Sequence, residues 1–495
     1  MNEGKRKHLI VVVVLLFVAI AGVQQVIEPI QAKMSKQASP QMGEDGKSLM
    51  VQLPGQFIVA SFMGFKEVIA GSLWVRAETF FHSGQYEAIV PIVRLVTWLD
   101  PHNIDVFTTG GWHLGYNFVD SSQKSDKRYL AAATGLLKEG IRANPNRWDL
   151  YFELGWTLYN RKMEDYENAI KYIGEACKYD GVDINTGAVQ PRPEFVDRML
   201  AYMLERAGDY EGTIKQWEKA RARAVRLQKA QDRTTYTGAG QSSVNVCDRN
   251  LALFYLRHAW RYGNMDYYKK GIELAENLSG EERAAVAKWA LDGAKADYQR
   301  RLAAGNPPRD ALKPLDTKFE ITWKKIKPRV LEVRGKLNLA QWSEYEGLAS
   351  EVFTHAYQKN QAMPPEKRQL WRDGCRVKWM LADYDYERTE SESLIVGIDT
   401  NQTVQWDSFY VQGGSFHGKI DFSDPNDRLF YPLKAEKYKL VFWFSPQEPG
   451  CPDFVQDRIG WKGEALTDAR YLDTKTQPGF RKLRVEYVLN REDIL

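Results

Sequence analysis

The feature that most constrains the fold is an internal repeat between residues 65 and 277. Small residues occupy equivalent positions in four successive segments, spaced by 34, 44 and 46 residues: Ala77, Gly111, Gly155 and Ala201. Polar insertions at 120–127 and 180–193 account for the two longer spacings. A small residue lets two antiparallel helices approach closely. Because one such unit cannot bury its apolar face alone, the repeat predicts stacked helical hairpins that form a solenoid.

Turn and stop residues recur in the same phase. Gly or Asp with Tyr marks the turn between the helices of a unit, as in the runs Gly84-Gln85-Tyr86-Glu87 and Gly208-Asp209-Tyr210-Glu211. Pro101 and Pro145 end the second helix of their units, since proline cannot continue the hydrogen-bond ladder. These residues resemble the tetratricopeptide repeat, a helix-turn-helix unit of 34 residues. The resemblance covers four copies and a degenerate fifth at about 250–277, and it implies a scaffold that binds a protein or peptide on its concave face.

The resemblance also places candidate binding residues. In such repeats the residue after the small one, and residues one turn further along the first helix, face the groove. Aromatic anchors among polar groups are typical of a peptide-binding groove. The alternative is that these aromatic residues pack between adjacent repeats. The candidate partner-binding residues are Trp112, Trp156, Tyr159, Asn160, Tyr202 and Arg206.

The N-terminus predicts export. Residues 1–8 include the basic run Lys5-Arg6-Lys7, and only two glutamines interrupt the apolar character of residues 9–27. Nineteen helical residues span ~28 Å, close to the ~30 Å hydrocarbon core. The basic flank favours a topology in which residues 1–8 stay in the cytoplasm and the rest of the chain is exported. The alternative is a signal peptide cleaved after Ala21. Both the anchor and the signal peptide predict that the bulk of the chain is extracytoplasmic, either periplasmic or at the cell surface. Residues 28–64 are expected to form a linker.

The periodicity changes toward the C-terminus. Residues 278–375 are expected to add further helices, at 281–304 and 339–361, with proline pairs as breaks. Short β-branched or aromatic runs then alternate with turn residues, at 376–386, 394–399, 403–410, 418–422, 438–444 and 483–489. This pattern predicts an antiparallel β-sandwich over 376–495, similar to small immunoglobulin-like or fibronectin-type modules. The expected fold is multidomain: a helical solenoid, a C-terminal all-β sandwich and one N-terminal transmembrane helix.

Motif searches predict no catalytic residue, no metal and no cofactor. The sequence has no HExxH, GxSxG, GxGxxG or phosphate-binding GxxxxGK[ST] pattern, and no CxxC pair. Asp421, Asp424 and Asp427 are expected to be solvated turn acids, with a hard-cation site as the alternative. The thiol of Cys177 is expected to be reduced and buried, with a disulfide as the alternative.

Charge argues against nucleic acid as a partner. The chain has 68 basic and 64 acidic residues, a net charge of +4, far from the excess of a dedicated nucleic-acid binder. Two basic stretches, at 218–233 and 313–336, are expected to be solvated helix faces. Contact with anionic lipid or an acidic partner is the alternative for both.

The predicted function is therefore a membrane-tethered, exported and non-catalytic scaffold that binds a protein or peptide partner. One alternative is a structural subunit of a cell-envelope complex. Another is a carbohydrate-active enzyme with its site between solenoid and sandwich, which would need two carboxylates ~5–10 Å apart.

Overall fold

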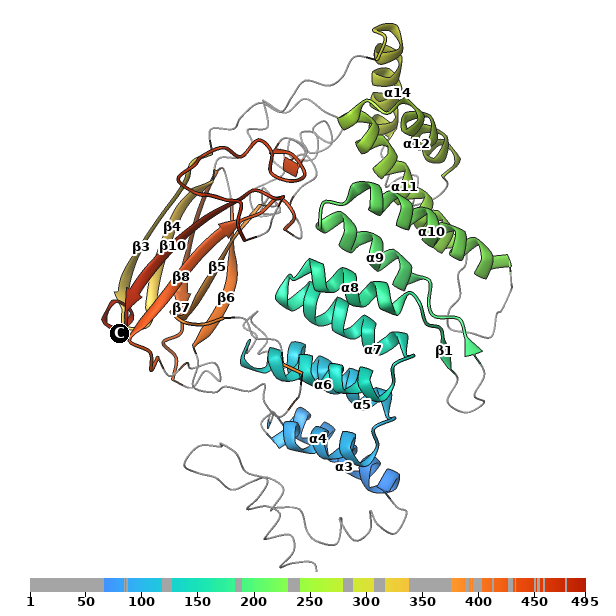
Figure 1. Ribbon diagram of the computed structural model, residues 1–495. Helices are drawn as coiled ribbons and strands as arrows, with labels where there is room; N and C mark the ends of the chain where they lie inside the picture. Colours follow the sequence, from blue (N-terminus) through green and yellow to red (C-terminus); the bar gives the residue numbers. More distant parts are fainter. Residues whose placement is uncertain are drawn as a thin grey trace, which may run out of the picture.

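The computed structural model describes residues 66–117, 127–182, 189–229, 241–278, 288–306, 317–337, 375–387 and 403–495, with short gaps at 84, at 86–87 and inside the last range, together with residues 391, 392 and 394. Within them, helices are followed by two antiparallel sheets (Figure 1). The predicted segments 1–8, 9–27 and 28–64 lie outside the described residues. No helix of the described part is both long and apolar enough to cross a membrane.

The described helices form five successive pairs, and each pair packs on the next (Figure 1). In chain order, the first helices of the five pairs are α3 (Lys66–His82), α5 (Ile104–Trp112) with η4 (His113–Asn117), α7 (Trp148–Phe152) with η6 (Glu153–Met163), α9 (Phe195–Arg206) and α11 (Gln241–Tyr262). The second helices are α4 (Ile89–Leu99), α6 (Leu130–Ala143) after η5 (Lys127–Tyr129), α8 (Tyr166–Ala176), α10 (Tyr210–Lys229) and α12 (Met265–Asn277). Helix α14 (Lys288–Ala303) packs on α12. Repeated helical pairs were predicted, and this coarse prediction is confirmed.

Glycines set how closely paired helices approach. A Cβ on Gly155 would lie 2.7 Å from Cγ1 and 3.0 Å from the backbone nitrogen of Ile173 in α8. A Cβ on Gly111 would lie 2.9 Å from Leu137 of α6. Both distances are too short for a methyl group, so only glycine allows this packing. Gly111 and Gly155 therefore allow the close approach of paired helices that was predicted for the small residues of the repeat.

The turns between first and second helices lie along one edge of the helical region, which we call the turn edge (residues 164–165, 208–209 and 263–264). Gly208 and Gly263 adopt left-handed φ values of 74° and 71° there. Glu164 occupies the same place in the third pair with φ 54°. Asp165 then caps α8 by accepting a hydrogen bond from the backbone N–H of Asn168 at 3.1 Å. The insertion at 180–193 contains the short strands β1 (Gly181–Val182) and β2 (Val189–Gln190).

The C-terminal region has two sheets around one core. A five-stranded sheet has the order β6–β5–β8–β10–β9, and a three-stranded sheet has the order β3–β4–β7, with every pair antiparallel. The strands are β3 (Phe319–Lys327), β4 (Val330–Leu337), β5 (Arg376–Asp383), β6 (Val404–Tyr410), β7 (Ser415–Asp421), β8 (Lys437–Phe444), β9 (Leu472–Asp473) and β10 (Lys482–Asn490), followed by α17 (Arg491–Ile494). Buried residues of both sheets, including Val333 and Phe442, share this core. Two antiparallel sheets were expected here, and this is confirmed.

The strands begin earlier than expected. β3 and β4 lie within 278–375, where only helices were predicted, whereas α14 agrees with the helix expected at 281–304. In β3, buried Phe319 and Ile321 alternate with exposed Glu320 and Thr322. The apolar–polar alternation is short, because the lysines in the second half of β3 interrupt it, and the basic stretch 313–336 was therefore not recognised as strands. The segments 339–361 and 395–399 lie outside the described residues.

Candidate functional site

The β region contacts the helical region at the turn edge, where Trp461 shares a buried cluster with residues of α9, α10 and α11. Trp461 is 3% exposed and packs with Tyr210 and with Tyr262, whose ring centroid is 5.8 Å away. The Arg257 guanidinium lies 5.5 Å from the centre of the Trp461 ring. Its Nη2 also donates a hydrogen bond to Oε1 of Gln456 at 3.2 Å. One tryptophan of the β region thus fills a cage built by the fourth and fifth pairs.

A buried ion pair joins the two regions at the third pair. The Lys378 ammonium on β5 lies 2.6 Å from a carboxylate oxygen of Glu448 and also contacts Glu164. The side chains of Lys378 and Glu448 are each 7% exposed. The two carboxylates that meet at this boundary therefore share one cation. Close by, burial raises the pKa of the Tyr166 hydroxyl well above its ordinary value, and the charge of Glu448 adds to this rise.

A third contact involves the second pair. Glu392 accepts hydrogen bonds from Lys138 at 2.9 Å and from Arg142 at 3.2 Å, and the bond from Lys138 lowers the pKa of its carboxyl. Leu394 is buried in the helical core, and its N–H donates to Glu139 Oε1 at 3.1 Å. The β region and its connection therefore contact the second to fifth pairs.

The predicted binding residue Trp112 lies at the end of α5 with 38% of its surface exposed. Its ring stacks on Tyr116 of η4 at 6.0 Å between centroids. Two cations from the next pair cover Tyr116: the Arg161 guanidinium at 4.9 Å and the Lys162 ammonium at 4.1 Å from the ring centre. Arg161 Nη2 also donates a hydrogen bond to the Tyr116 hydroxyl at 3.0 Å. These four residues join the first helices of the second and third pairs.

Trp156, Asn160 and Arg206 repeat this arrangement one pair further on. The Arg206 guanidinium of α9 lies 6.0 Å from the centre of the Trp156 ring, and its Nη1 donates to Oδ1 of Asn160. Trp156 is half-buried, and Asn160 is 1% exposed. We call the whole set the first-helix row; its members are Trp112, Tyr116, Trp156, Asn160, Arg161, Lys162 and Arg206.

The other two predicted residues face inward. Tyr159 is fully buried and stacks on Tyr172 of α8 at 5.3 Å. Tyr202 is half-buried, meets Trp217 of α10 edge to face at 5.1 Å, and has a pKa raised by burial. Tyr159 thus lies in the core, and Tyr202 packs within its own pair.

The departure from the predicted register has a local cause. Both η4 and η6 are π-helical, with hydrogen bonds from residue i to i+5. Each turn therefore holds about one residue more than in an α-helix. One turn after Trp156 comes the pair Asn160 and Arg161 rather than Tyr159 and Asn160. An α-helical register cannot identify Tyr116, Arg161 and Lys162 as members of the row, and the sequence has no recognised signal for a π-helix.

Lys162 is the member of the row whose pKa is shifted. Burial, together with a smaller effect of the neighbouring Arg161 charge, lowers the pKa of its ammonium to about 8. Glu153, the carboxylate of the same π-helix, accepts a hydrogen bond from Thr157 Oγ1 at 2.6 Å, and burial raises its pKa. The carboxylate of Glu153 is therefore engaged within its own helix.

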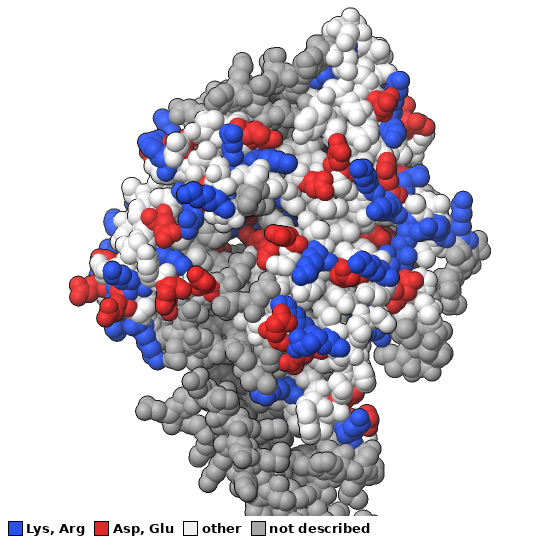
Figure 2. All heavy atoms as spheres, viewed as in Figure 1, with Lys and Arg blue, Asp and Glu red and all other residues white. Residues whose placement is uncertain are grey.

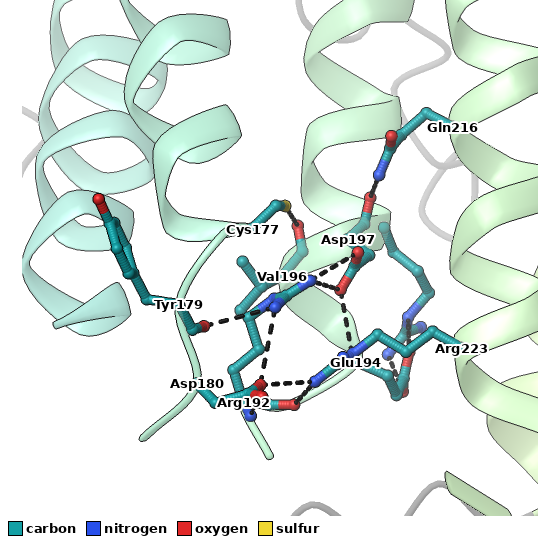
Figure 3. A network of polar contacts seen from close by, with 10 residues as sticks. Cys177, Tyr179, Asp180, Arg192, Glu194, Val196, Asp197, Gln216 and Arg223 are labelled. Atoms are coloured by element: carbon teal, nitrogen blue, oxygen red, sulfur yellow. Dashed lines mark hydrogen bonds and ion pairs between the residues drawn. The ribbon is translucent and has the colours of Figure 1, made fainter. Parts of the chain in front are cut away.

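Two of the six cations of the basic stretch at 218–233, Arg221 and Arg223, pair with acidic residues of the chain. Figure 3 shows Arg192 paired with both carboxylate oxygens of Asp197 at 3.0 Å, and Arg223 bound to Asp180 at 3.2 Å. Arg221 pairs with Asp248 of α11. These contacts hold the insertion at 180–193 against α10. Across the face shown in Figure 2, described acidic and basic side chains are interspersed.

Metal ligands are not gathered in the described part of the chain, where no three His, Cys, Asp or Glu residues form a group that could hold an ion. Asp421 accepts hydrogen bonds from the N–H and hydroxyl of Ser423, as a turn acid does, and Asp427 lies outside the described residues. Cys177 is not in a disulfide, and burial raises the pKa of its thiol to about 12.

No protein-family model and no curated protein matches the sequence. Among solved structures, the chain is similar to one described as "Crystal structure of MamA protein", at 17% sequence identity and a TM-score of 0.24. The match covers 44% of this chain and 98% of that one. A TM-score this low does not establish a common fold.

Proposed function

We propose that this chain is a non-catalytic interaction scaffold of tetratricopeptide type, which binds a protein or peptide through the first-helix row. The observation that carries the proposal is the row itself. Trp112 and Trp156 occupy equivalent positions of successive first helices, each in contact with further members of the row, and Trp112 is 38% exposed. Stacked repeats create extended binding surfaces in this way.

The position of the β region supports the same surface. It contacts the turn edge and packs Trp461 against the fourth and fifth pairs. The exposed members of the row, Trp112 and Arg161, lie on the second and third pairs. In the proposal, the β region braces the helical pairs, and the partner binds beside it.

We further propose that the chain is exported and tethered by residues 9–27. The support is the apolar run behind a basic flank. A protease added to intact cells would then degrade a C-terminal tag, and mass analysis of the mature N-terminus would distinguish an anchor from a cleaved signal peptide.

The binding proposal is tested by panning a random peptide library against the full chain and measuring the affinity of the selected peptides by fluorescence anisotropy. Trp112→Ala should weaken binding by ~2 kcal/mol, about thirtyfold. Trp98→Ala is the matched control, because Trp98 is 62% exposed on α4 and outside the row. Equal affinities for both variants and the parent chain would place the binding surface elsewhere.

A further inference from the structure

Three cations of the first-helix row contact rings or an amide instead of a carboxylate. Arg161 and Lys162 lie over Tyr116, and Arg206 lies over Trp156 and binds Asn160. None of the three forms an ion pair with a described residue. Three positive charges thus lie on the third and fourth pairs with no described carboxylate paired to them.

Other arginines of the same first helices differ. Arg198 of α9 pairs with Glu194 at 2.9 Å, and Arg257 of α11 pairs with Glu205 at 3.7 Å. Carboxylates of neighbouring residues therefore pair with some arginines of the first helices. At Arg161, Lys162 and Arg206 the partners are instead rings and an amide.

The row is also held rigidly in place. Each cation sits against a ring, which stabilises its position and reduces the entropy lost when a ligand binds. Arg161 keeps a fixed direction through its bond to the Tyr116 hydroxyl. Two π-helical segments carry five of the seven members of the row; such segments are rare overall and are found frequently at functional sites.

We infer that the first-helix row binds an acidic segment of a partner protein, with carboxylates paired to Arg161, Lys162 and Arg206 and an apolar side chain packed on Trp112. This inference rests on the proposed function and adds the chemistry of its ligand. Guanidinium groups favour carboxylates because two parallel N–H bonds can form at once. The exposed face of Trp112 then supplies the apolar part of the contact.

The test uses two pools of 12-residue peptides with the full chain. In the acidic pool, positions are randomised among Asp, Glu, Tyr, Leu and Gly; in the matched pool, Asn and Gln replace Asp and Glu. We expect the acidic pool to bind at least tenfold more tightly, and the difference to shrink as salt is raised. The double variant R161A/R206A should lose at least tenfold for the acidic pool and little for the amide pool.

The control variant is K215A/K219A, which removes the same number of charges from the exposed face of α10. It should keep the affinity of the parent chain, and circular dichroism should show that both variants are folded. If the amide pool binds equally well and Trp112→Ala abolishes that binding, the acidic ligand is refuted while the proposed function stands. If neither pool binds, or if K215A/K219A loses as much as R161A/R206A, both the inference and the proposed function fail.

Discussion

Gly155 shows at the scale of one residue how the sequence determines the packing of the third pair. Its hydrogen faces the backbone of α8, and any larger side chain would overlap Ile173. We expect Gly155→Ala to lower the free energy of unfolding by ~1–3 kcal/mol, because the two helices must separate. Urea denaturation followed by circular dichroism measures this change.

Gly174 on α8 is the matched control, since a Cβ there would meet no other heavy atom within 4 Å. Gly174→Ala should raise the free energy of unfolding by ~0.5–1 kcal/mol, because alanine loses less backbone freedom on folding. Equal effects of the two substitutions would contradict the close approach described for η6 and α8.

Lys162 gives the row a pH dependence. Its ammonium has a pKa of about 8 and is faced by Arg161 of its own helix and by Tyr116 of η4. The amine is charged below that pH and neutral above it. Binding of the acidic pool should therefore weaken by ~two- to fivefold as the pH rises from 7 to 9. In Lys162→Met this part of the pH dependence should disappear; an unchanged profile would mean that Lys162 does not contact the ligand.

At the scale of elements, the helical pairs could be predicted because small residues and turn residues recur in phase. The strands β5, β6, β7, β8 and β10 could be predicted because their runs are rich in β-branched or aromatic residues and turn residues separate them, whereas the two-residue strand β9 was not predicted. β3 and β4 were not predicted, since the cations of 313–336 masked their period of two. The π-helical segments η4 and η6 could not be predicted either, and this is why Tyr116, Arg161 and Lys162 were missed. The placement of Trp461 depends on contacts with residues far away in the sequence, and a local sequence pattern does not predict such contacts.

Trp461 links a loop of the β region to α10 and α11. Trp461→Ala should lower the free energy of unfolding by ~3–5 kcal/mol, because a large buried side chain leaves a cavity. It should also separate the helical and β transitions in a thermal scan monitored at helical and aromatic wavelengths. Trp98→Ala, an exposed tryptophan on α4, should change stability by less than ~0.5 kcal/mol. A single unshifted transition in Trp461→Ala would contradict the described contact.

At the scale of the whole molecule, Lys378 holds the β region to the helical region. Glu164 keeps a left-handed backbone at a place where Gly208 and Gly263 serve the other turns. Left-handed backbone is costly for residues other than glycine, so the contact with Lys378 offers a physical reason for glutamate there. The strained residue and the buried cation belong to the same contact between regions.

Removing Lys378 leaves the carboxylates of Glu164 and Glu448 without the cation that contacts both. Lys378→Met should lower the free energy of unfolding by ~3–5 kcal/mol, since an uncompensated buried charge is costly. Lys178→Met, which removes an exposed partner of Glu175, should leave the urea midpoint unchanged. If Lys378→Met has the midpoint of the parent chain, the ion pair does not hold the two regions together.

Hydrogen–deuterium exchange of the full chain, with and without a peptide selected by panning, tests most directly whether the first-helix row is the binding surface. We expect the peptide to slow exchange in residues 104–117 and 148–163, because a ligand on the row stabilises both first helices. Exchange in β3 and β4, at 319–337, should stay the same. Protection confined to the sheets or to α10, with no change at 104–117 and 148–163, would contradict the account.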